Sequence, residues 1–208
     1  MPGNKSNRHW ITRQRNDPFV DKARKAGYRS RSAYKLLEID RRDGLFRRGD
    51  TVVDLGAAPG GWSQVARERV GGQGRVIAID ILPFEPIPGV ISLEGDMRDR
   101  QTHDRVIELL AGNSAQVVIS DMAPNISGSA ILDQPRILQI ATSALEAGIR
   151  FLSPDGNFLI KVFQGEEFDA FVGAMQRAFT KTRVRKPKAS RASSREVYVL
   201  GLGLSPGA

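Results

Sequence analysis

A glycine-rich turn directly after a short apolar stretch has the residue types that let a backbone approach a ligand closely. Residues 51–55 are mostly apolar, and Gly56, Gly60 and Gly61 follow them. Because glycine has no Cβ atom, the chain can turn sharply there and bring backbone N–H groups against a bound molecule. A turn of this kind between a strand and a helix is a common nucleotide-binding position in α/β proteins.

A carboxylate at the end of the next apolar stretch strengthens this interpretation. Asp80 ends the stretch 75–80 and lies 20 residues after Gly60, a spacing typical of an acid that binds ribose hydroxyls. The spacing Gly-x-x-x-Gly-Gly differs from the Gly-x-Gly-x-x-Gly of dinucleotide enzymes. It fits S-adenosylmethionine better, because that molecule has ribose and adenine but no pyrophosphate. Another nucleotide, or a site that has lost its ligand, is the alternative.

Four further polar residues are expected near the same edge of a sheet: Lys35, Asp121, Lys161 and Glu196. Asp121 ends an apolar stretch, and ligands of open α/β sheets bind outside the carboxyl ends of the strands. Lys161 lies inside a stretch apolar enough to be buried, where a lysine rarely occurs without a partner or a purpose.

Each of these residues also has a plain structural interpretation. Lys35 could pair with Glu38 one helical turn away, Lys161 could extend its ammonium group to water, and Glu196 could neutralise the basic residues before it. Of these interpretations, the one for Lys161 is the least satisfactory.

The elements that must position these residues alternate between strand and helix patterns. We predict helices at 30–42, 61–70, 100–111, 133–151 and 166–179, and strands at 51–55, 75–80, 89–94, 116–120, 156–162, 182–186 and 195–203. This alternation predicts an α/β fold with a doubly wound, mostly parallel sheet. The connection 187–194 is too short for a crossover helix, so the last two strands should form an antiparallel hairpin.

Length and composition favour one domain in a reducing compartment. The 208 residues suit a flexible basic arm at 1–17 followed by a single domain at 18–208. The absence of cysteine excludes disulfides, thiolate metal sites and a cysteine nucleophile. No stretch approaches the roughly 20 apolar residues of a membrane span, and the start of the chain lacks the apolar segment of a signal peptide. We therefore expect a cytoplasmic protein that does not bind membranes, and a monomer.

Positive charge is concentrated in two parts of the chain. Residues 1–48 hold 14 Lys and Arg against 5 Asp and Glu, and residues 177–195 hold 8 against none. The remaining residues are net acidic, although the whole chain carries a formal charge of +8. Two uncompensated basic clusters indicate a nucleic-acid partner more than two solvated surfaces.

Four segments strongly resemble the FtsJ/RrmJ family of ribosomal RNA 2′-O-methyltransferases, and the resemblance covers nearly the whole chain. The segments are YRSRSAYKLLE (28–38), DLGAAPGGWSQ (54–64), SDMAPN (120–125) and KVFQG (161–165). The resemblance implies a Rossmann-like methyltransferase domain that modifies a uridine of large-subunit ribosomal RNA. We expect this RNA to be met within the assembled large subunit, although the sequence leaves free RNA open as the substrate. The resemblance also implies a catalytic tetrad of Lys35, Asp121, Lys161 and Glu196, and cofactor contacts from Gly60, Trp62, Asp80, Asp96 and Asp121.

The chemistry of ribose methylation is consistent with these residue types. The enzyme must align a hydroxyl oxygen with an already activated methyl group and remove one proton, for which no metal is needed. Burial and Lys35 would favour the neutral, basic form of Lys161, whereas Asp121 and Glu196 would oppose it. Whether Lys161 abstracts the proton or positions the oxygen therefore stays open.

Two other functions fit parts of the sequence. A non-enzymatic RNA-binding assembly factor could retain the cofactor fold, but it would not require a buried Lys161 with Asp121. A methyltransferase for protein or small molecules would not require two basic clusters. The two histidines, His9 and His103, suggest neither catalysis nor metal binding.

Overall fold

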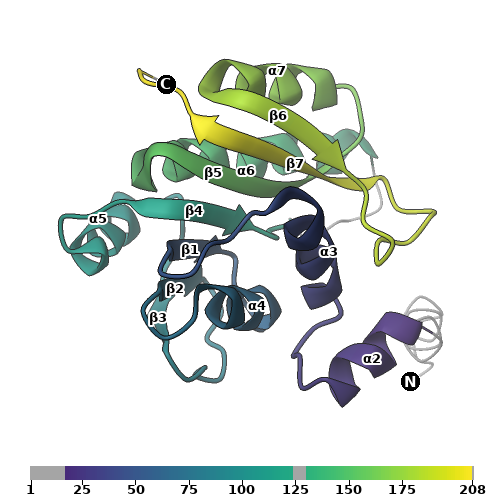
Figure 1. Cartoon of the computed structure of the whole chain (residues 1–208). Helices are drawn as coiled ribbons and strands as arrows, with labels where there is room; N and C mark the ends of the chain where they lie inside the picture. The colour runs from purple at the N-terminus through teal and green to yellow at the C-terminus, as the bar shows by residue number, and fades with distance from the viewer. Residues whose placement is uncertain (1–16, 124–129, 208) are drawn as a thin grey trace, which may run out of the picture.

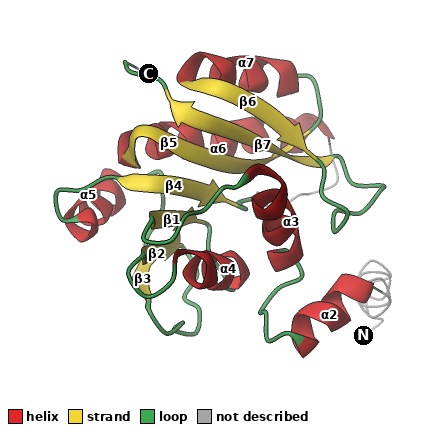
Figure 2. Ribbon diagram, viewed as in Figure 1, coloured by secondary structure: helices red, strands yellow, loops and turns green. Residues whose placement is uncertain are grey.

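The computed structural model describes residues 17–123 and 130–207, and for 130–134 only the backbone is considered. Within these residues the strands form one twisted sheet in the order β3-β2-β1-β4-β5-β7-β6 (Figures 1 and 2). The strands are β1 (Thr51–Leu55), β2 (Arg75–Asp80), β3 (Val90–Glu94), β4 (Ala115–Ser120), β5 (Leu152–Phe163), β6 (Phe179–Arg185) and β7 (Glu196–Leu204). Strands β1 to β5 pair in parallel, and β7 is antiparallel to both β5 and β6. The doubly wound, mostly parallel sheet with an antiparallel hairpin is thereby confirmed.

Helices cover both faces of this sheet. They are α2 (Pro18–Lys25), α3 (Ala33–Asp43), α4 (Gly61–Val70), α5 (Arg100–Leu110), α6 (Ala130–Phe151) and α7 (Phe168–Ala178). In Figure 1, α3 and α4 lie in front of the sheet and α6 lies behind it. Side chains of a parallel strand point to the two faces in turn, so each central strand contributes to two cores.

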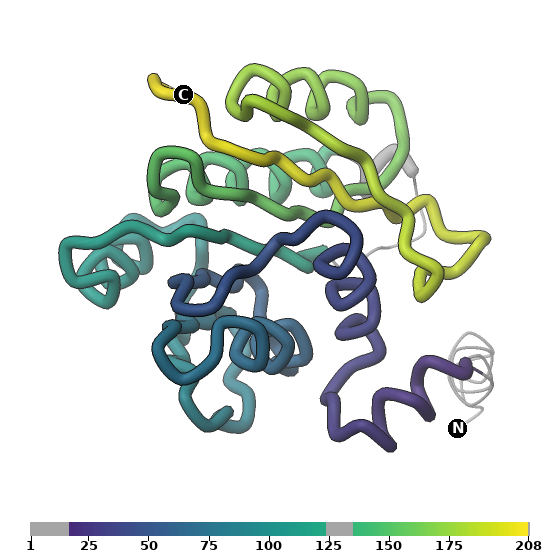
Figure 3. The backbone as a smooth tube through the Cα atoms, viewed as in Figure 1, coloured from purple at the N-terminus to yellow at the C-terminus, as the bar shows by residue number. Residues whose placement is uncertain are grey.

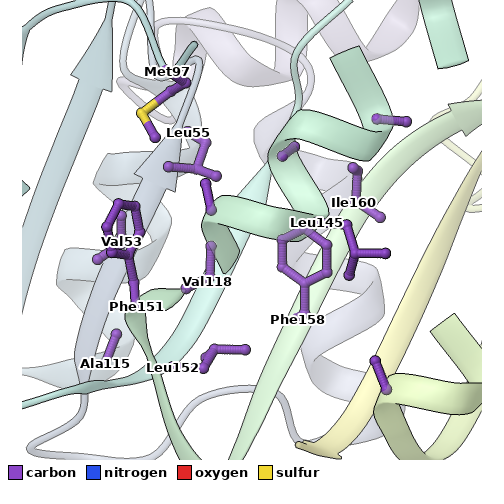
Figure 4. Packing of buried hydrophobic residues seen from close by; sticks show 14 of the residues in the cluster. Val53, Leu55, Met97, Ala115, Val118, Leu145, Phe151, Leu152, Phe158 and Ile160 are labelled. Carbon is purple, nitrogen blue, oxygen red and sulfur yellow. The ribbon is translucent and has the colours of Figure 1, made fainter. Parts of the chain in front are cut away.

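The two cores are divided by the alternation along each strand. Val53 and Leu55 of β1 pack with α5 and α6, together with Val118, Phe158 and Ile160 of the neighbouring strands (Figure 4). The intervening residues of these strands pack with α3 and α4 in the second core. The helices are therefore fixed on both faces by fully buried aliphatic and aromatic side chains.

The strand register brings the expected chemistry to one edge of the sheet. Ser120 of β4 pairs with Ile160 of β5, so Asp121 follows at the level of Lys161. Lys161 in turn pairs with Tyr198 of β7. Parallel strands end at the same edge, and β7 enters from that edge because it is antiparallel.

Some boundaries differ from the sequence prediction. Helix α2 was not predicted, yet Asp17 caps it by accepting the Phe19 N–H at 3.1 Å, and Pro18 occupies its first turn. Strand β6 begins at Phe179, where a longer helix was predicted, because Phe179 turns into the core. The predicted basic arm lies at 1–17, and residues 1–16 fall outside the described residues.

Asp43 joins the end of α3 to the edge of the sheet. Its enclosed carboxylate accepts two hydrogen bonds from Arg185, at 2.7 and 2.8 Å, and one from Arg183. The hydrogen bonds from Arg185, with a smaller contribution from Arg183, lower the pKa of Asp43 against the opposing effect of burial. The helix that carries Lys35 is thus fastened to β6.

Replacing Asp43 should therefore destabilise the fold. We expect Asp43→Ala to lower the free energy of unfolding by about 3 kcal/mol, because two guanidinium groups lose their buried partner. Urea denaturation at pH 7 measures this change. Asp21→Ala, which removes an exposed pair with Arg24, is the control and should cost less than about 1 kcal/mol. Equal losses for the two variants would contradict the prediction.

Candidate active site at the carboxyl edge of the sheet

Two ion pairs occupy this edge of the sheet. The Lys35 Nζ of α3 donates to Glu196 Oε1 of β7 at 2.6 Å. The Lys161 Nζ of β5 lies 3.0 Å from Asp121 Oδ1 and also donates to the Asp121 carbonyl oxygen. All four side chains are less than one fifth exposed. The structure therefore brings together the four residues of the predicted tetrad from four separate elements of the chain.

Tyr198 joins the two pairs, and it was not predicted as a site residue. Its hydroxyl lies 3.1 Å from Asp121 Oδ1 and 3.2 Å from Glu196 Oε1. Burial, with the charges of Asp121 and Glu196, raises its pKa well above the ordinary value, so the hydroxyl keeps its proton. One proton serves one carboxylate at a time, and Tyr198 therefore couples them. The sequence feature that could have identified Tyr198 is its position two residues after Glu196, which places both side chains on the same face of a strand.

The electrostatics of Glu196 favour an ionised carboxylate. Burial by itself would raise its pKa, but the charge and hydrogen bond of Lys35 outweigh that effect, with help from Lys161 and a hydrogen bond from Ser190. The pKa of Glu196 consequently lies below its ordinary value. A negative charge is thus kept beside the two lysines at neutral pH.

Trp62 supports the tetrad from the core. Its side chain is buried, its ring lies 5.6 Å from the Tyr198 ring, and its Nε1–H donates to the Ser32 carbonyl at 2.9 Å. The indole of Trp62, which lies in the first turn of α4, is therefore enclosed by other protein groups. A contact between Trp62 and a cofactor, as predicted, would therefore have to use its backbone.

The glycine-rich turn has a steric explanation in the structure. Gly56 and Gly60 have φ angles of +74° and +104°, which disfavour residues with a Cβ atom. A Cβ on Gly56 would lie 2.1 Å from the Met122 side chain, and one on Gly60 would lie 2.6 Å from that of Ile87. Both positions therefore exclude larger residues, and the turn stays tight around the ends of β1 and β4.

Asp80 anchors this turn and the segment after β2. Its Oδ2 accepts the Ala58 N–H and its Oδ1 accepts the Leu82 N–H, each at 2.8 Å. Each oxygen retains acceptor capacity for a ligand hydroxyl. Ile81 and Leu82 follow directly and are both 61% exposed, an unusual exposure for large apolar side chains. Exposed apolar side chains next to an acid with free acceptor capacity would suit a purine base, and no expectation for them arose from the sequence.

Asp96 lies after β3 and is held by Arg98. The guanidinium contacts both carboxylate oxygens, and the Arg98 backbone N–H donates to Oδ1 at 2.9 Å. These hydrogen bonds from Arg98 lower the pKa of Asp96. Asp96 is thus a fixed acceptor, but any ligand at this position must share it with Arg98.

Asp54 is a buried acid for which the sequence analysis gave no role. Its Oδ2 accepts the Ser63 hydroxyl at 2.6 Å, whereas its Oδ1 has no hydrogen-bond partner among the described residues. Burial raises the pKa of Asp54 to about 7; Ser63 opposes this shift, and the charges of Asp121 and Asp80 add to it. An unpaired, buried acceptor beneath the glycine turn suits a ligand that brings a donor or a positive charge. The residues around the turn therefore fit S-adenosylmethionine.

The two basic clusters of the sequence meet beside the tetrad. Arg31 pairs with Asp17, and Arg191 lies 3.6 Å from the same carboxylate. The Lys188 backbone N–H donates to Glu38 of α3 at 2.9 Å. The segment between β6 and β7 therefore packs against α3 and contributes its positive charge to the same region.

The described parts of the chain hold neither a cluster of metal-binding side chains nor a membrane-spanning helix. In 17–123 and 130–207, no three His, Asp or Glu side chains gather as metal ligands do. In the same ranges, no helix has the length and apolar character needed to cross a membrane.

The raised pKa of Asp54 predicts a pH-dependent stability. Unfolding lowers this pKa from about 7 to the ordinary 3.8. The protonated Asp54 carboxyl therefore contributes its full stabilisation below about pH 4, and this stabilisation is lost as the pH rises to 7. We expect the free energy of unfolding of Asp54→Asn, relative to that of the parent protein, to rise between pH 5 and pH 8 by on the order of 3 kcal/mol. Chemical denaturation across this range measures the gain. The control Glu146→Gln, at an exposed position, should show none, and a constant difference for Asp54→Asn would refute the assignment.

Comparison with known proteins identifies the family. The model of the FtsJ-like methyltransferase family matches residues 28–204. The chain is 52% identical over 204 residues to the ribosomal RNA large subunit methyltransferase E of Azoarcus sp. (strain BH72), which covers 98% of this chain and 100% of that protein. It is 50% identical to the protein of the same name from Alcanivorax borkumensis, over 96% of each chain.

A solved structure supports the same assignment. A crystal structure described as a ribosomal RNA methyltransferase from Plasmodium falciparum superposes with a TM-score of 0.78 and 25% identity, over 85% of this chain and 98% of that one. The family match covers both the glycine turn and the two ion pairs. The chain therefore belongs to the FtsJ-like methyltransferase family and is a methyltransferase.

Proposed function

We propose that this protein transfers a methyl group from S-adenosylmethionine to the ribose 2′-hydroxyl of a uridine in large-subunit ribosomal RNA. One observation carries the proposal: two ion pairs, Lys35–Glu196 and Lys161–Asp121, lie beside the glycine turn, and the Tyr198 hydroxyl lies within hydrogen-bond distance of both carboxylates. The relatives described above carry names that specify this RNA. We further propose a single, monomeric domain over 18–208 that acts in the cytoplasm on the assembled large subunit.

The proposed cofactor cradle lies around the ends of β1, β2 and β4. S-adenosylmethionine, when bound, supplies a methyl group activated by a sulfonium ion. Asp80 would accept hydrogen bonds from the ribose hydroxyls, and Ile81 and Leu82 would cover one face of the adenine. Asp96 would accept from the adenine amine. The backbone of Gly60 and Trp62, and the side chain of Asp121, would complete the cradle.

The tetrad would position the substrate hydroxyl. Lys161 is held by the carbonyl and carboxylate of Asp121 and has one further N–H with which to fix the 2′-oxygen. Lys35 and Glu196 form a second, parallel pair that would receive or stabilise the departing proton. Because all four side chains are largely buried, their charges act in a medium that screens them less than water does. Alignment of the oxygen with the methyl group then accounts for much of the rate.

The RNA-binding role rests on the basic surface beside the tetrad. Arg31 and Arg191 gather around Asp17, next to the elements that carry Lys35 and Glu196. A surface with an excess of cations would bind phosphates, and its affinity for RNA would decrease steeply with salt. A protein substrate would not require this surface.

A methylation assay tests the proposed function. The protein is incubated with methyl-labelled S-adenosylmethionine and large ribosomal subunits from cells that lack it, and the alkali-resistant 2′-O-methyl position is mapped. Label in one uridine of the large-subunit RNA supports the proposal. Label only in protein, or in a base, would overturn it. Free RNA assayed in parallel decides whether the assembled subunit is required.

Lys161 should be the most sensitive residue of the tetrad. We expect Lys161→Ala to lower single-turnover methylation at least about 10²-fold, with little change in RNA and cofactor affinity. Lys161→Arg should fail nearly as badly, because a planar guanidinium has a different shape and cannot hold the Asp121 carbonyl, the Asp121 carboxylate and the 2′-oxygen with the same geometry. The exposed Lys181→Ala serves as the control and should retain turnover. Near-normal turnover of Lys161→Ala at saturating RNA and cofactor would refute the mechanism.

Asp80 should contribute to cofactor affinity. We expect Asp80→Ala to weaken S-adenosylmethionine binding about tenfold or more in titration calorimetry, because two hydroxyl hydrogen bonds to a carboxylate are lost. Asp80→Asn keeps the size of the side chain and one acceptor oxygen, so its affinity for S-adenosylmethionine should lie between those of Asp80→Ala and the parent protein. Circular dichroism checks that the fold is retained. Unchanged affinity would mean that Asp80 only anchors the turn.

A further inference from the structure

The connection between β6 and β7, residues 186–195, is basic but firmly packed at its centre. Lys188 is tied to Glu38 through its backbone, and Arg191 lies beside Asp17. Between them, Ala189 and Ser190 are buried. Figure 3 shows this connection on the side of the molecule where α2 and α3 lie. A loop that carries several cations for a ligand thus has two buried residues at its middle.

Ser190 reaches the tetrad directly. Its Oγ donates to Glu196 Oε1 at 2.9 Å, the same oxygen that accepts from the Lys35 Nζ at 2.6 Å. Among the described residues this is the one hydrogen bond that the Ser190 hydroxyl makes. Three donors therefore converge on a single carboxylate oxygen, since the Tyr198 hydroxyl lies 3.2 Å from it.

The convergence matters because Tyr198 has one proton and two acceptors. If Tyr198 donates to Asp121, the Glu196 oxygen depends on Lys35 and Ser190 alone. Without Ser190, Tyr198 would be drawn toward Glu196, and Asp121 would lose a donor. The Lys161–Asp121 pair would then be disturbed by loss of Ser190, although the Ser190 hydroxyl has no hydrogen bond to either residue in the described structure.

We propose that Ser190 is a positioning residue for methyl transfer: its hydroxyl holds the Glu196 carboxylate against Lys35 and leaves the Tyr198 proton to Asp121. The proposal rests on the proposed function of this site. It also links the basic connection to the tetrad, because Ser190 lies two positions after Lys188 and directly before Arg191.

The first test compares turnover with binding. We expect Ser190→Ala to lower kcat about tenfold, as for a lost hydrogen bond to a charged group, with RNA and cofactor Kd values within about twofold of the parent. Ser190→Thr, which keeps the hydroxyl, should restore most of the rate. Ser193→Ala is the matched control, because Ser193 is exposed on the same connection. Normal turnover of Ser190→Ala would overturn the proposal.

The second test asks whether Ser190 acts through Glu196. In a Glu196→Ala background, Ser190→Ala should cause no further loss of kcat, whereas additive losses would overturn the proposal. Loss of the donor should also raise the pKa of Glu196. The acidic limb of the pH–rate profile of Ser190→Ala should accordingly lie at higher pH than that of the parent.

A readout without activity separates this proposal from the proposed function. The Glu196 carboxyl carbon is followed by NMR during a pH titration of the full chain and of Ser190→Ala. A higher midpoint in the variant supports the role of Ser190, and an unchanged midpoint overturns it. If the parent protein fails to methylate the RNA, the proposed function fails, whatever the titration shows.

Discussion

The site depends on the placement of β7 between β5 and β6. This strand pairs Tyr198 with Lys161 and brings Glu196 to the same edge of the sheet. Because Tyr198 is enclosed and has one proton for two carboxylates, neither ion pair can rearrange independently of the other. Trp62 of α4 packs against the Tyr198 ring, and α3 supplies Lys35 to Glu196. Both helices on this face of the sheet therefore contact the group of residues around Tyr198. The candidate active site is accordingly an extension of the second core, which includes Trp62 and Tyr198, rather than a set of loops.

Burial and charge are balanced differently in the two halves of the site. Around the tetrad, each carboxylate has a lysine partner, which offsets the cost of removing it from water. Under the glycine turn, Asp54 has one hydroxyl donor and an oxygen without a partner in the described residues. The charges of the tetrad are paired with one another, whereas the residues under the glycine turn include a carboxyl oxygen that can still accept a hydrogen bond. This contrast agrees with a site that aligns one substrate and receives a cationic second one.

The order of most elements could be predicted from the sequence, because apolar stretches with terminal acids are local patterns. The four polar residues of the tetrad followed from such patterns only in part, and their grouping came from the resemblance to a family. The structure places their side chains together, and their catalytic role stays a prediction. The sequence also led to the correct family through short motifs around Gly60 and Lys161. Helix α2 was missed because it is short, with eight residues and few apolar side chains. Its start signal, Asp17 directly before Pro18, is present in the sequence and was interpreted only as the end of the basic arm. Tyr198 and Ser190 were missed for another reason. An aromatic residue in a strand resembles a core residue, and a serine in a basic loop resembles a solvent-exposed one. Only the folded structure shows that both hydroxyls lie at Glu196.

The antiparallel insertion of β7 has a consequence for the order of assembly. Lys35 and Glu196 are 161 residues apart in the chain, and the strand that joins them must enter between two others. Contacts of such long range form late, because the entropy of closing the intervening chain is paid before they stabilise anything. The parallel half of the sheet and the glycine turn are built from nearer neighbours. We therefore expect the Lys35–Glu196 pair to form after the glycine turn and its neighbouring parallel strands, so that the candidate site is completed only when β7 has paired with β5.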